Sequence, residues 1–446
     1  MSQLMYHFGF KYRFYPSDQQ KTVIKINSDQ SRYYYNHLIA NKRKLGWIIH
    51  THYTHGITKL NVIKNYEKTL KPGEFRERHN FLNDDYLDGC MFGTTKQNNQ
   101  RAYVNHWNGL QGQPNFHSKK AAPYVWKYQT SFISWETKHG RNQNIKFKDA
   151  KHLVLPKLGT ITLGHDTQLY NQHYVRIGTV TVTKSADNKY YISGQLGSDY
   201  PFKKYLPETH KACGIDLNIS NFLMTSDGKV VNNPRFYTKG LPHLKSLNQR
   251  VSRRRRYAVN NRIDLSVDKG YQRARIRHAE FETHIKNERR NFLENLSTKL
   301  IENQDLIVAE DLKSSNILRN HRIAQKASDC GWREFLSMLQ QKAKMYGKTV
   351  ILINPAYTTQ KCASCGFVCT KSNGYHLILS DRAWICPHCG AVHVRDWNAA
   401  NNILAEGVAQ IFKQRRENLI KLKRTRTPQE FLSRPNLTFE FQRVKS

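Results

Sequence analysis

The alternation of apolar and polar residues near the start of the chain predicts a half-buried strand followed by a long helix. Aromatic side chains occupy every second position from Phe8 to Phe14, with Gly, Lys and Arg between them, as expected of a strand with one face on a core. Pro16 ends this pattern, and Ser17 is a suitable cap for a helix that continues to Leu38. From there to about residue 121 the pattern remains mostly helical, polar and basic.

Between residues 123 and 200 the sequence again alternates between two kinds of residue, which predicts several strands. Thr and Val alternate over residues 178–183, Asp187 and Asn188 supply a turn, and the alternation resumes over residues 190–196. Together with the first strand, these segments predict a small β-barrel interrupted by a helical insertion. Such barrels commonly bind oligonucleotides along a basic, aromatic face.

Short apolar runs alternate with long helical stripes from Ala212 onward, which predicts an α/β domain. The run CGIDL is followed by a tight return at Asp227–Gly228 and a second strand. Residues 276–300 carry the apolar stripe of a long helix, which leads into the buried run LIVAEDL. Residues 349–353 predict a further strand.

Three carboxylates stand out in this part of the chain. Asp216 and Glu310 lie in otherwise apolar strands, where a charged side chain is rarely tolerated without a partner or a metal ion. Asp396 begins a helix with an apolar inner face, where an acid by itself indicates only a favourable interaction with the helix dipole. Ser328 or Asp329 is expected to cap the helix over residues 332–343, and Asp329 is interpreted first as such a cap and second as a fourth acid.

Convergent carboxylates bind hard divalent cations, Mg²⁺ or Mn²⁺, which keep water in their coordination shell. Two such ions about 3.5–4 Å apart can activate a water molecule and stabilise the leaving 3′ oxygen of a phosphodiester. In a basic protein this chemistry indicates cleavage of nucleic acid. The residues therefore predict a metal-dependent nuclease.

Two C-x-x-C pairs, Cys362 with Cys365 and Cys386 with Cys389, predict a structural Zn²⁺ site. The interval between the pairs allows two short hairpin loops to close on one ion, and four thiolates suit a tetrahedral zinc with no open position. A Gly follows each pair, as a tight turn requires. The alternative interpretation is a pair of redox or coincidental repeats.

The other four cysteines have no evident partners: Cys90, Cys213, Cys330 and Cys369. Cys369 is interpreted as a free thiol, with a spare zinc ligand as the alternative. This usage indicates a reducing compartment instead of a disulfide framework. The first residues contain no apolar segment of a signal peptide, and no apolar run approaches bilayer length. We therefore expect a cytoplasmic, prokaryotic protein that is associated with the nucleoid when bound to DNA.

The charge indicates a polyanionic partner. Lys and Arg number 71 against 34 Asp and Glu, a formal net charge of +37, and the basic residues recur throughout the chain. Nucleic acid is the favoured partner, and a membrane surface is the weaker alternative. Arg253, Arg254, Arg255 and Arg256 form one block, interpreted as a helix that follows phosphates, the alternative being a solvated charge run.

Three histidines lie close together in the helical insertion: His50, His52 and His55. An H-x-H sequence is typical of the metal pair of a tyrosine-dependent, DNA-nicking transposase. That motif requires an apolar middle residue on a strand, whereas Thr51 stands here in a loop-like stretch. The histidines therefore do not favour a metal site, and a transposase that joins DNA ends is disfavoured.

Four motifs, in order, resemble the three RuvC motifs and the zinc ribbon of the transposon-encoded TnpB proteins, relatives of the type V CRISPR nucleases. They are GIDLN, IVAEDL, the CxxC…CPHCG ribbon and RDWNAANNI. The opening FKYRFYPSDQQ and RYYYNHLIA, and the segments LPKLGTITL and SDCGWREF, are also similar to that family. The resemblance covers most of the chain and is most specific in its C-terminal half.

The resemblance implies a multidomain α/β fold with an RNase H-like RuvC nuclease domain, a zinc-ribbon insert and an N-terminal wedge β-barrel interrupted by a helical recognition lobe. The implied segments are the first wedge strand (1–16), the recognition lobe (17–122), the remaining wedge (123–205), the RuvC-like nuclease with basic bridging helices (206–355), the ribbon that binds target nucleic acid (356–393), the final RuvC helix (394–412) and a basic, mobile tail (413–446).

Carried over residue by residue, Asp216, Glu310 and Asp396 match the family's catalytic, Mg²⁺-binding acids, and the four cysteines of the two pairs match its zinc ligands. Arg382 and Arg395 are implied contacts to nucleic acid. The chain departs from the family at two positions. Asn218 stands where the family usually has Gly, and Val394 where an acid is common. The second change is expected to weaken a contact to the metal or to Arg395.

The implied activity is RNA-guided cleavage of double-stranded DNA, with one RuvC site cutting both strands beside a short recognised motif. The implied partners are a guide RNA and a DNA target, bound by a monomer on one guide RNA, with a dimer as the alternative. A compact type V CRISPR effector has the same chemistry and differs in its genomic neighbourhood. A nuclease-inactive, RNA-guided repressor is disfavoured because all three acids are present.

Overall fold

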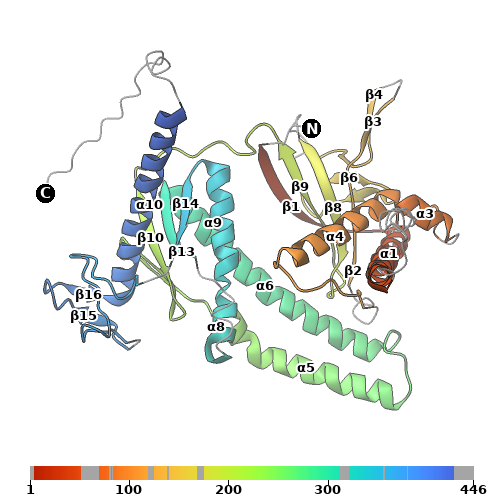
Figure 1. The fold of residues 1–446 in the computed structure, drawn as a ribbon. Coiled ribbons are helices and arrows are strands. Elements are labelled where there is room, and N and C mark those ends of the chain that lie inside the picture. Colours follow the sequence, from red (N-terminus) through yellow and green to blue (C-terminus); the bar gives the residue numbers. More distant parts are fainter. Residues whose placement is uncertain are drawn as a thin grey trace. The chain divides into compact units, whose positions relative to one another are not determined.

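The structure, a computed structural model, describes residues 5–51, 70–79, 82, 84–118, 125–137, 140–167, 175–311, 321–354, 357–378 and 380–425. The chain forms two compact units (Figure 1). The first comprises Met1–Phe202 and Pro242–His284, and the second comprises Lys203–Leu241 and Ile285–Ser446. The finer division into seven segments stays a prediction.

The first unit contains a four-stranded antiparallel sheet that includes the strand predicted at the start of the chain. Its order is β1 (Tyr6–Phe14), β9 (Tyr190–Ser198), β8 (Arg176–Lys184) and β2 (Trp126–Thr130). Strands β8 and β9 form the predicted hairpin, and Asn188 has the positive φ of 59° that its tight turn requires. The alternating aromatic residues of β1 are confirmed as the inward face, since Phe10 and Phe14 are buried in the core.

Smaller sheets complete the β structure of this unit. One consists of β5 (Lys146–Phe147), β6 (His152–Leu155) and β7 (Gly159–Thr162), and a hairpin consists of β3 (Ser134–Thr137) and β4 (Gly140–Gln143). A bridge between Phe14 and Leu163 links the three-stranded sheet to the four-stranded one, and both share one core. Within the described residues, the predicted barrel is thus two sheets joined at a bridge.

The helical insertion is present as α1 (Asp18–Thr51), α3 (Pro72–Glu77) and α4 (Gly89–Trp107). Ser17 caps α1 as predicted, because its hydroxyl accepts from the Gln20 N–H at 3.2 Å while the Gln20 side chain accepts from the Ser17 N–H at 3.0 Å. The helix is longer than predicted and ends at Thr51. His52 and His55 of the histidine group lie outside the described residues.

The second unit is built on a five-stranded sheet of order β12 (Val230–Asn232), β11 (Asn221–Thr225), β10 (Ala212–Leu217), β13 (Leu306–Glu310) and β14 (Thr349–Ile353). Strands β10, β13 and β14 are parallel, and β11 and β12 are antiparallel to their neighbours. Buried side chains of α6 (Lys269–Asn303) and α9 (Trp332–Tyr346) cover one face, and α10 (Arg395–Thr425) covers the other (Figure 1).

The prediction that Asp329 or the Ser before it caps α9 is wrong. Residues His321–Cys330 form a helix of their own, α8, and Gly331 with a φ of 68° ends it and begins α9. The Asp329 carboxylate instead accepts from the backbone N–H groups of Tyr237 and Thr238, at 2.9 and 3.1 Å. It thereby satisfies the first turn of α5 (Phe236–Asn260) from another part of the chain.

The C-terminal helix is also longer than predicted. Instead of ending near residue 412, α10 continues through Thr425. The residues that follow 412 are mainly Lys, Arg, Glu, Gln and Leu, with no Gly or Pro before Pro428, and they favour a helix even without an apolar stripe. Residues 426–446 of the predicted tail lie outside the described part of the chain. No helix that the structure describes has the length and apolar character needed to span a bilayer.

Candidate metal centres

The structure places Asp216 and Glu310 side by side on neighbouring strands. Strands β10 and β13 pair Gly214 with Val308 and Ile215 with Ala309, so the next residues along them are the two acids. Side chains alternate along a strand, and Asp216 therefore points to the same face of the sheet as Gly214. That face is covered by α10, because a Cβ atom on Gly214 would lie 2.1 Å from the Ala400 carbonyl oxygen.

Helix α10 brings the third acid to the same place. Asp396 lies in its first turn, and further along the helix Gly407 packs so closely on β13 that an added Cβ would lie 2.4 Å from the Val308 side chain. The Asn218 amide, just beyond the carboxyl end of β10, donates to the Asp396 carboxylate at 3.2 Å. The helix start therefore lies at the carboxyl end of that strand.

Burial and the neighbouring acids change the charge state of Asp216. Burial raises the pKa of Asp216 to about 7, and the negative charges of Glu310 and Asp396 add to the effect. Burial also raises the pKa of Glu310, against a hydrogen bond from Thr358. A cation near these groups would favour their ionised forms. The chemistry of the set, three oxygen donors at the edge of a buried sheet, is that of a Mg²⁺ or Mn²⁺ site.

Within the described residues, the four cysteines are the one group of three or more His, Cys, Asp or Glu ligands whose ligand atoms all lie within 4.8 Å of one another. The three carboxylates do not form such a group.

Because a buried, repelled carboxylate opposes folding, the change Asp216→Asn is expected to stabilise the metal-free protein. The pKa of Asp216 rises from 3.8 to about 7 on folding, so stability without Mg²⁺ falls as the pH increases from about 4 to 7 and stays low above that range. In Mg²⁺-free buffer at pH 8, we expect Asp216→Asn to raise the Tm by about 5 °C, a gain that shrinks toward pH 4.

Differential scanning calorimetry at several pH values measures this effect. The control is Asp311→Asn, a change at an exposed acid next to Glu310, which should leave the Tm unchanged. A Tm for Asp216→Asn equal to or below that of the wild type at pH 8 contradicts the prediction.

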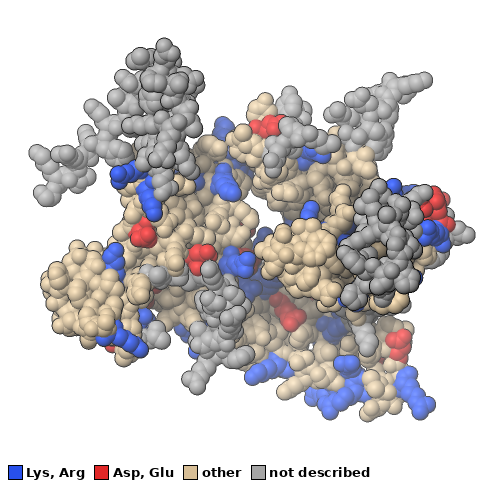
Figure 2. Space-filling model, viewed as in Figure 1, with Lys and Arg blue, Asp and Glu red and all other residues tan. Residues whose placement is uncertain are grey.

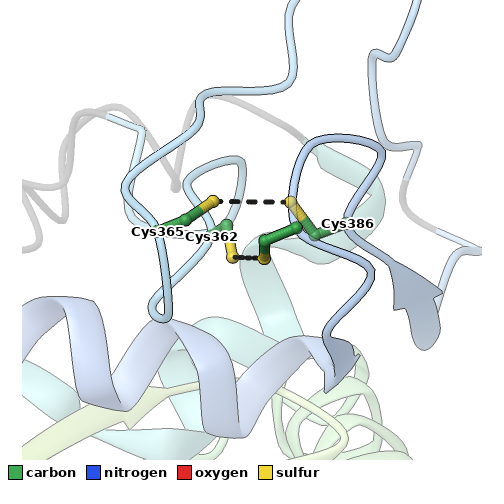
Figure 3. Close-up of side chains that lie close together, drawn as sticks. Cys362, Cys365 and Cys386 are labelled. Atoms are coloured by element: carbon green, nitrogen blue, oxygen red, sulfur yellow. Dashed lines mark hydrogen bonds between the residues drawn. The ribbon is translucent and has the colours of Figure 1, made fainter.

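The structure also brings the four predicted cysteines together at the ribbon. The sulfur atoms of Cys362 and Cys389 lie 3.7 Å apart, as do those of Cys365 and Cys386 (Figure 3). A tetrahedral zinc with Zn–S bonds of about 2.3 Å separates its sulfur atoms by about 3.8 Å. The donor set and its spacing thus fit Zn²⁺.

The turns of the ribbon hold these sulfur atoms in place. Gly366 and Gly390, with φ of 79° and 72°, close the two knuckles by donating their N–H groups to the carbonyls of Cys362 and Cys386. The second knuckle forms the loop of the hairpin of β15 (Ala383–Ile385) and β16 (Val392–Val394). Cys369 is buried in the same cluster but is not one of the four grouped ligands.

A histidine that the sequence did not single out lies against the cysteine group. The His393 Nε2 atom is 3.0 Å from the Cys362 sulfur, and the ring is buried against Trp384 with 4.8 Å between ring centroids. Hydrogen bonds from outside the ligand shell commonly orient metal ligands. The sequence did not indicate this contact of His393, because the spacing H-x-R-D up to Asp396 belongs to no metal motif.

The predicted nucleic-acid contacts differ in exposure. Arg253, Arg254, Arg255 and Arg256 are all exposed on α5, where Figure 2 shows Lys and Arg gathered. Arg382 is exposed, with its Nη1 atom 3.8 Å from an Asp396 oxygen. Arg395 is only 9% exposed and donates to the Ile378 carbonyl, which leaves it little surface for nucleic acid.

Family models match three parts of the chain. A model described as "Cas12f1-like, TNB domain" matches residues 332–403, and the OrfB IS605 models described as "Probable transposase" and "Helix-turn-helix domain" match residues 180–321 and 5–45. The last range is β1 and most of α1 in the structure, a strand and a helix. The chain is therefore similar to IS605 OrfB proteins over two ranges and to Cas12f1-like proteins over the third.

Similar proteins extend these matches to most of the chain. A Streptomyces pristinaespiralis protein named as an RNA-guided DNA endonuclease is 28% identical over 403 residues, 90% of this chain and 89% of that protein. The Escherichia coli K12 protein InsQ, named likewise, is 27% identical over 294 residues, 61% of this chain and 68% of that protein. Other relatives are named as TnpB-like proteins, and the chain is thus similar to TnpB-family proteins.

Among solved structures, one titled "Cryo-EM structure of the Cas12f1-sgRNA-target DNA complex" is similar over 89% of this chain and 98% of that chain, with 12% identity and a TM-score of 0.49.

Proposed function

We propose that this protein is an RNA-guided, metal-dependent DNA endonuclease. The observation that carries the proposal is the meeting of Asp216, Glu310 and Asp396, from two adjacent strands and a helix start, at one buried edge of the sheet. Relatives named as RNA-guided DNA endonucleases support the same activity. A Cas12f1-like ribbon model supports a compact type V CRISPR effector equally, and a transposon end or a CRISPR array beside the gene separates the two.

Asp216, Glu310 and Asp396 would hold the Mg²⁺ ions. Bound there, the ions supply Lewis acidity toward the phosphate and lower the pKa of the attacking water. The chain's own part is to hold the carboxylates in fixed positions, and the bound cations would favour their ionised forms. The Asn218 amide orients Asp396. Asp216 is buried away from water, and charge interactions are stronger in such weakly polar surroundings.

The charge of +37 suits a protein that holds a guide RNA and both DNA strands. In RNA-guided nucleases, base pairing supplies sequence specificity and basic residues hold the backbones. The exposed arginines 253–256 on α5 are suited to such backbone contacts. The zinc ribbon has a structural role in this scheme, since a four-thiolate shell leaves no open position for catalysis.

A pocket in the first unit is the proposed reader of the short duplex motif beside the target. It has a volume of about 510 Å³ and is lined from α1, α4 and β2 by residues that include Arg32, Asn98, Lys127 and Gln129. The Asn98 amide donates to the Gln129 side chain. Side-chain amides read adenine edges, and Arg and Lys bind guanine or phosphate.

Sequencing the RNA that co-purifies with the protein, followed by cleavage of a plasmid library with randomised flanks, tests the function. The expected result is one RNA species with a variable end, and cutting only of plasmids that match it beside a fixed motif. Cutting without a matching RNA overturns RNA guidance, and the absence of cutting in Mg²⁺ overturns the nuclease.

The same library tests the pocket. Changing Asn98 or Gln129 to Ala is expected to relax the motif and to slow cleavage of the preferred plasmid about tenfold, because each base contact contributes about 1–3 kcal/mol. Gln97→Ala, at an exposed position on the same helix, is the control. An unchanged motif in both pocket variants contradicts the assignment.

A further inference from the structure

A short turn before the first cysteine knuckle touches the carboxylate site. Thr358 is 7% exposed, and its hydroxyl donates to the Glu310 Oε1 atom at 2.5 Å. The turn is closed by hydrogen bonds from the Gln360 and Lys361 N–H groups to the Tyr357 carbonyl. A hydroxyl aimed at one carboxylate oxygen fixes the rotation of that carboxylate and leaves its other oxygen for a cation.

Two buried asparagines hold this turn to the helix that carries Asp396. Asn402 donates to the carbonyls of Thr358 and Lys361, at 2.9 and 2.6 Å. Asn398, one helical turn earlier, donates to the Lys361 carbonyl at 2.7 Å and accepts from the Ala363 N–H at 2.9 Å. Buried amides with this many partners fix the position of the backbone they contact.

The turn therefore connects three parts of the second unit. It reaches Glu310 on β13 through Thr358, it reaches α10 through the asparagines, and Cys362 follows Lys361 directly. If these bonds served only to fold the ribbon, the turn would need contacts to α10 alone. The bond from Thr358 to an acid of the metal site is the one that a purely structural turn does not require.

We propose that Thr358 is a positioning residue for Glu310, and that Asn398 and Asn402 hold it in register with the helix of Asp396. The inference rests on the proposed function, since it assigns Glu310 to the metal site. Without the Thr358 hydroxyl, the Glu310 carboxylate rotates more freely, and the site binds a divalent cation less tightly. Loss of such an outer contact typically weakens metal binding about 10–100-fold.

A matched set of substitutions at this turn tests the inference. Thr358→Val keeps the shape and removes the hydroxyl, Thr358→Ser keeps the hydroxyl, and Thr358→Ala is a second hydroxyl-free variant in case Val disturbs folding. Thr359→Val, at the adjacent half-buried position, is the control. For each protein, purified with its RNA, the measurements are Mn²⁺ binding by electron paramagnetic resonance, zinc content, Tm and affinity for target DNA.

We expect Thr358→Val and Thr358→Ala to bind Mn²⁺ about 10–100-fold more weakly than the wild type, with one zinc per chain and unchanged DNA affinity. Thr358→Ser and Thr359→Val should match the wild type. Loss of zinc from both hydroxyl-free variants indicates a merely structural role and overturns the inference.

The Asp216→Ala variant separates the inference from the proposed function. If Asp216→Ala weakens Mn²⁺ binding but Thr358→Val leaves it at the wild-type level, only the inference is overturned. If the wild type and Asp216→Ala bind Mn²⁺ alike, the proposed metal site itself is overturned, together with the role assigned to Thr358.

Discussion

Each of the changes Asp216→Ala, Glu310→Gln and Asp396→Ala is expected to slow DNA cleavage by about 10³-fold or more, with guided binding to DNA near the wild-type level. Asp216 and Glu310 are buried at the ends of neighbouring strands, and none of the three acids belongs to the exposed block of arginines 253–256 on α5. Removing one acid therefore removes cation ligation but leaves the contacts to nucleic-acid backbones in place.

Cleavage of a matched plasmid in Mg²⁺ and DNA affinity in Ca²⁺ or without divalent cations measure the two properties separately. Asp311→Asn, at the exposed neighbour of Glu310, is the matched control and should cut normally. Normal cutting by any one of the three variants refutes the assignment of that acid. A parallel loss of DNA binding in all three would indicate a folding defect instead of lost chemistry.

Much of the second unit was predictable because its strands are short apolar runs. Asp216 and Glu310 are exceptional residues within such runs, since an unpaired charge in a buried strand is costly. The sequence did not predict their register, which depends on pairing between strands about ninety residues apart in the chain. It also gave no reason for Gly214, whose missing side chain is what allows α10 to lie on the sheet.

The missed features are mostly polar contacts between distant segments. Asp329 has the local features of a cap for the next helix, yet it bonds to the start of α5 because Gly331 separates it from α9. Asn398 and Asn402 are one helical turn apart beside an apolar stripe, a pattern that predicts a polar contact but not its partner. No local pattern marks Thr358 as a neighbour of Glu310.

The two departures from the family differ in their relation to the site. Asn218 contacts it directly, since its amide donates to Asp396 and its side-chain carbonyl accepts from the Asn221 N–H at 2.8 Å. A Gly there would make neither contact. Val394 is 49% exposed on β16, paired with Ala383 across the hairpin. Its side chain lies on the outer face of the hairpin, opposite to that of His393.

Cys365→Ser is expected to reduce zinc content below one per chain, lower the yield of folded protein and abolish cleavage. Structural zinc contributes about 10–16 kcal/mol to the folding of small zinc domains, and the ribbon has only a small core of its own, formed by Cys362, Cys369, Cys386 and Trp384. Without the ion, the four close sulfur atoms lose the attraction that holds both knuckles together.

Cys369→Ser is the matched control, because Cys369 is buried in the same cluster but is not one of the four grouped ligands. It should retain one zinc per chain and cut DNA, with at most a modest loss of Tm. Metal analysis, limited proteolysis and plasmid cleavage compare the two variants. We expect new proteolytic sites between residues 357 and 394 in Cys365→Ser, since the bonds from Asn398 to Lys361 and Ala363 cannot hold a ribbon without its ion. A zinc-free Cys365→Ser protein that is protease-resistant and active contradicts the structural role of the metal.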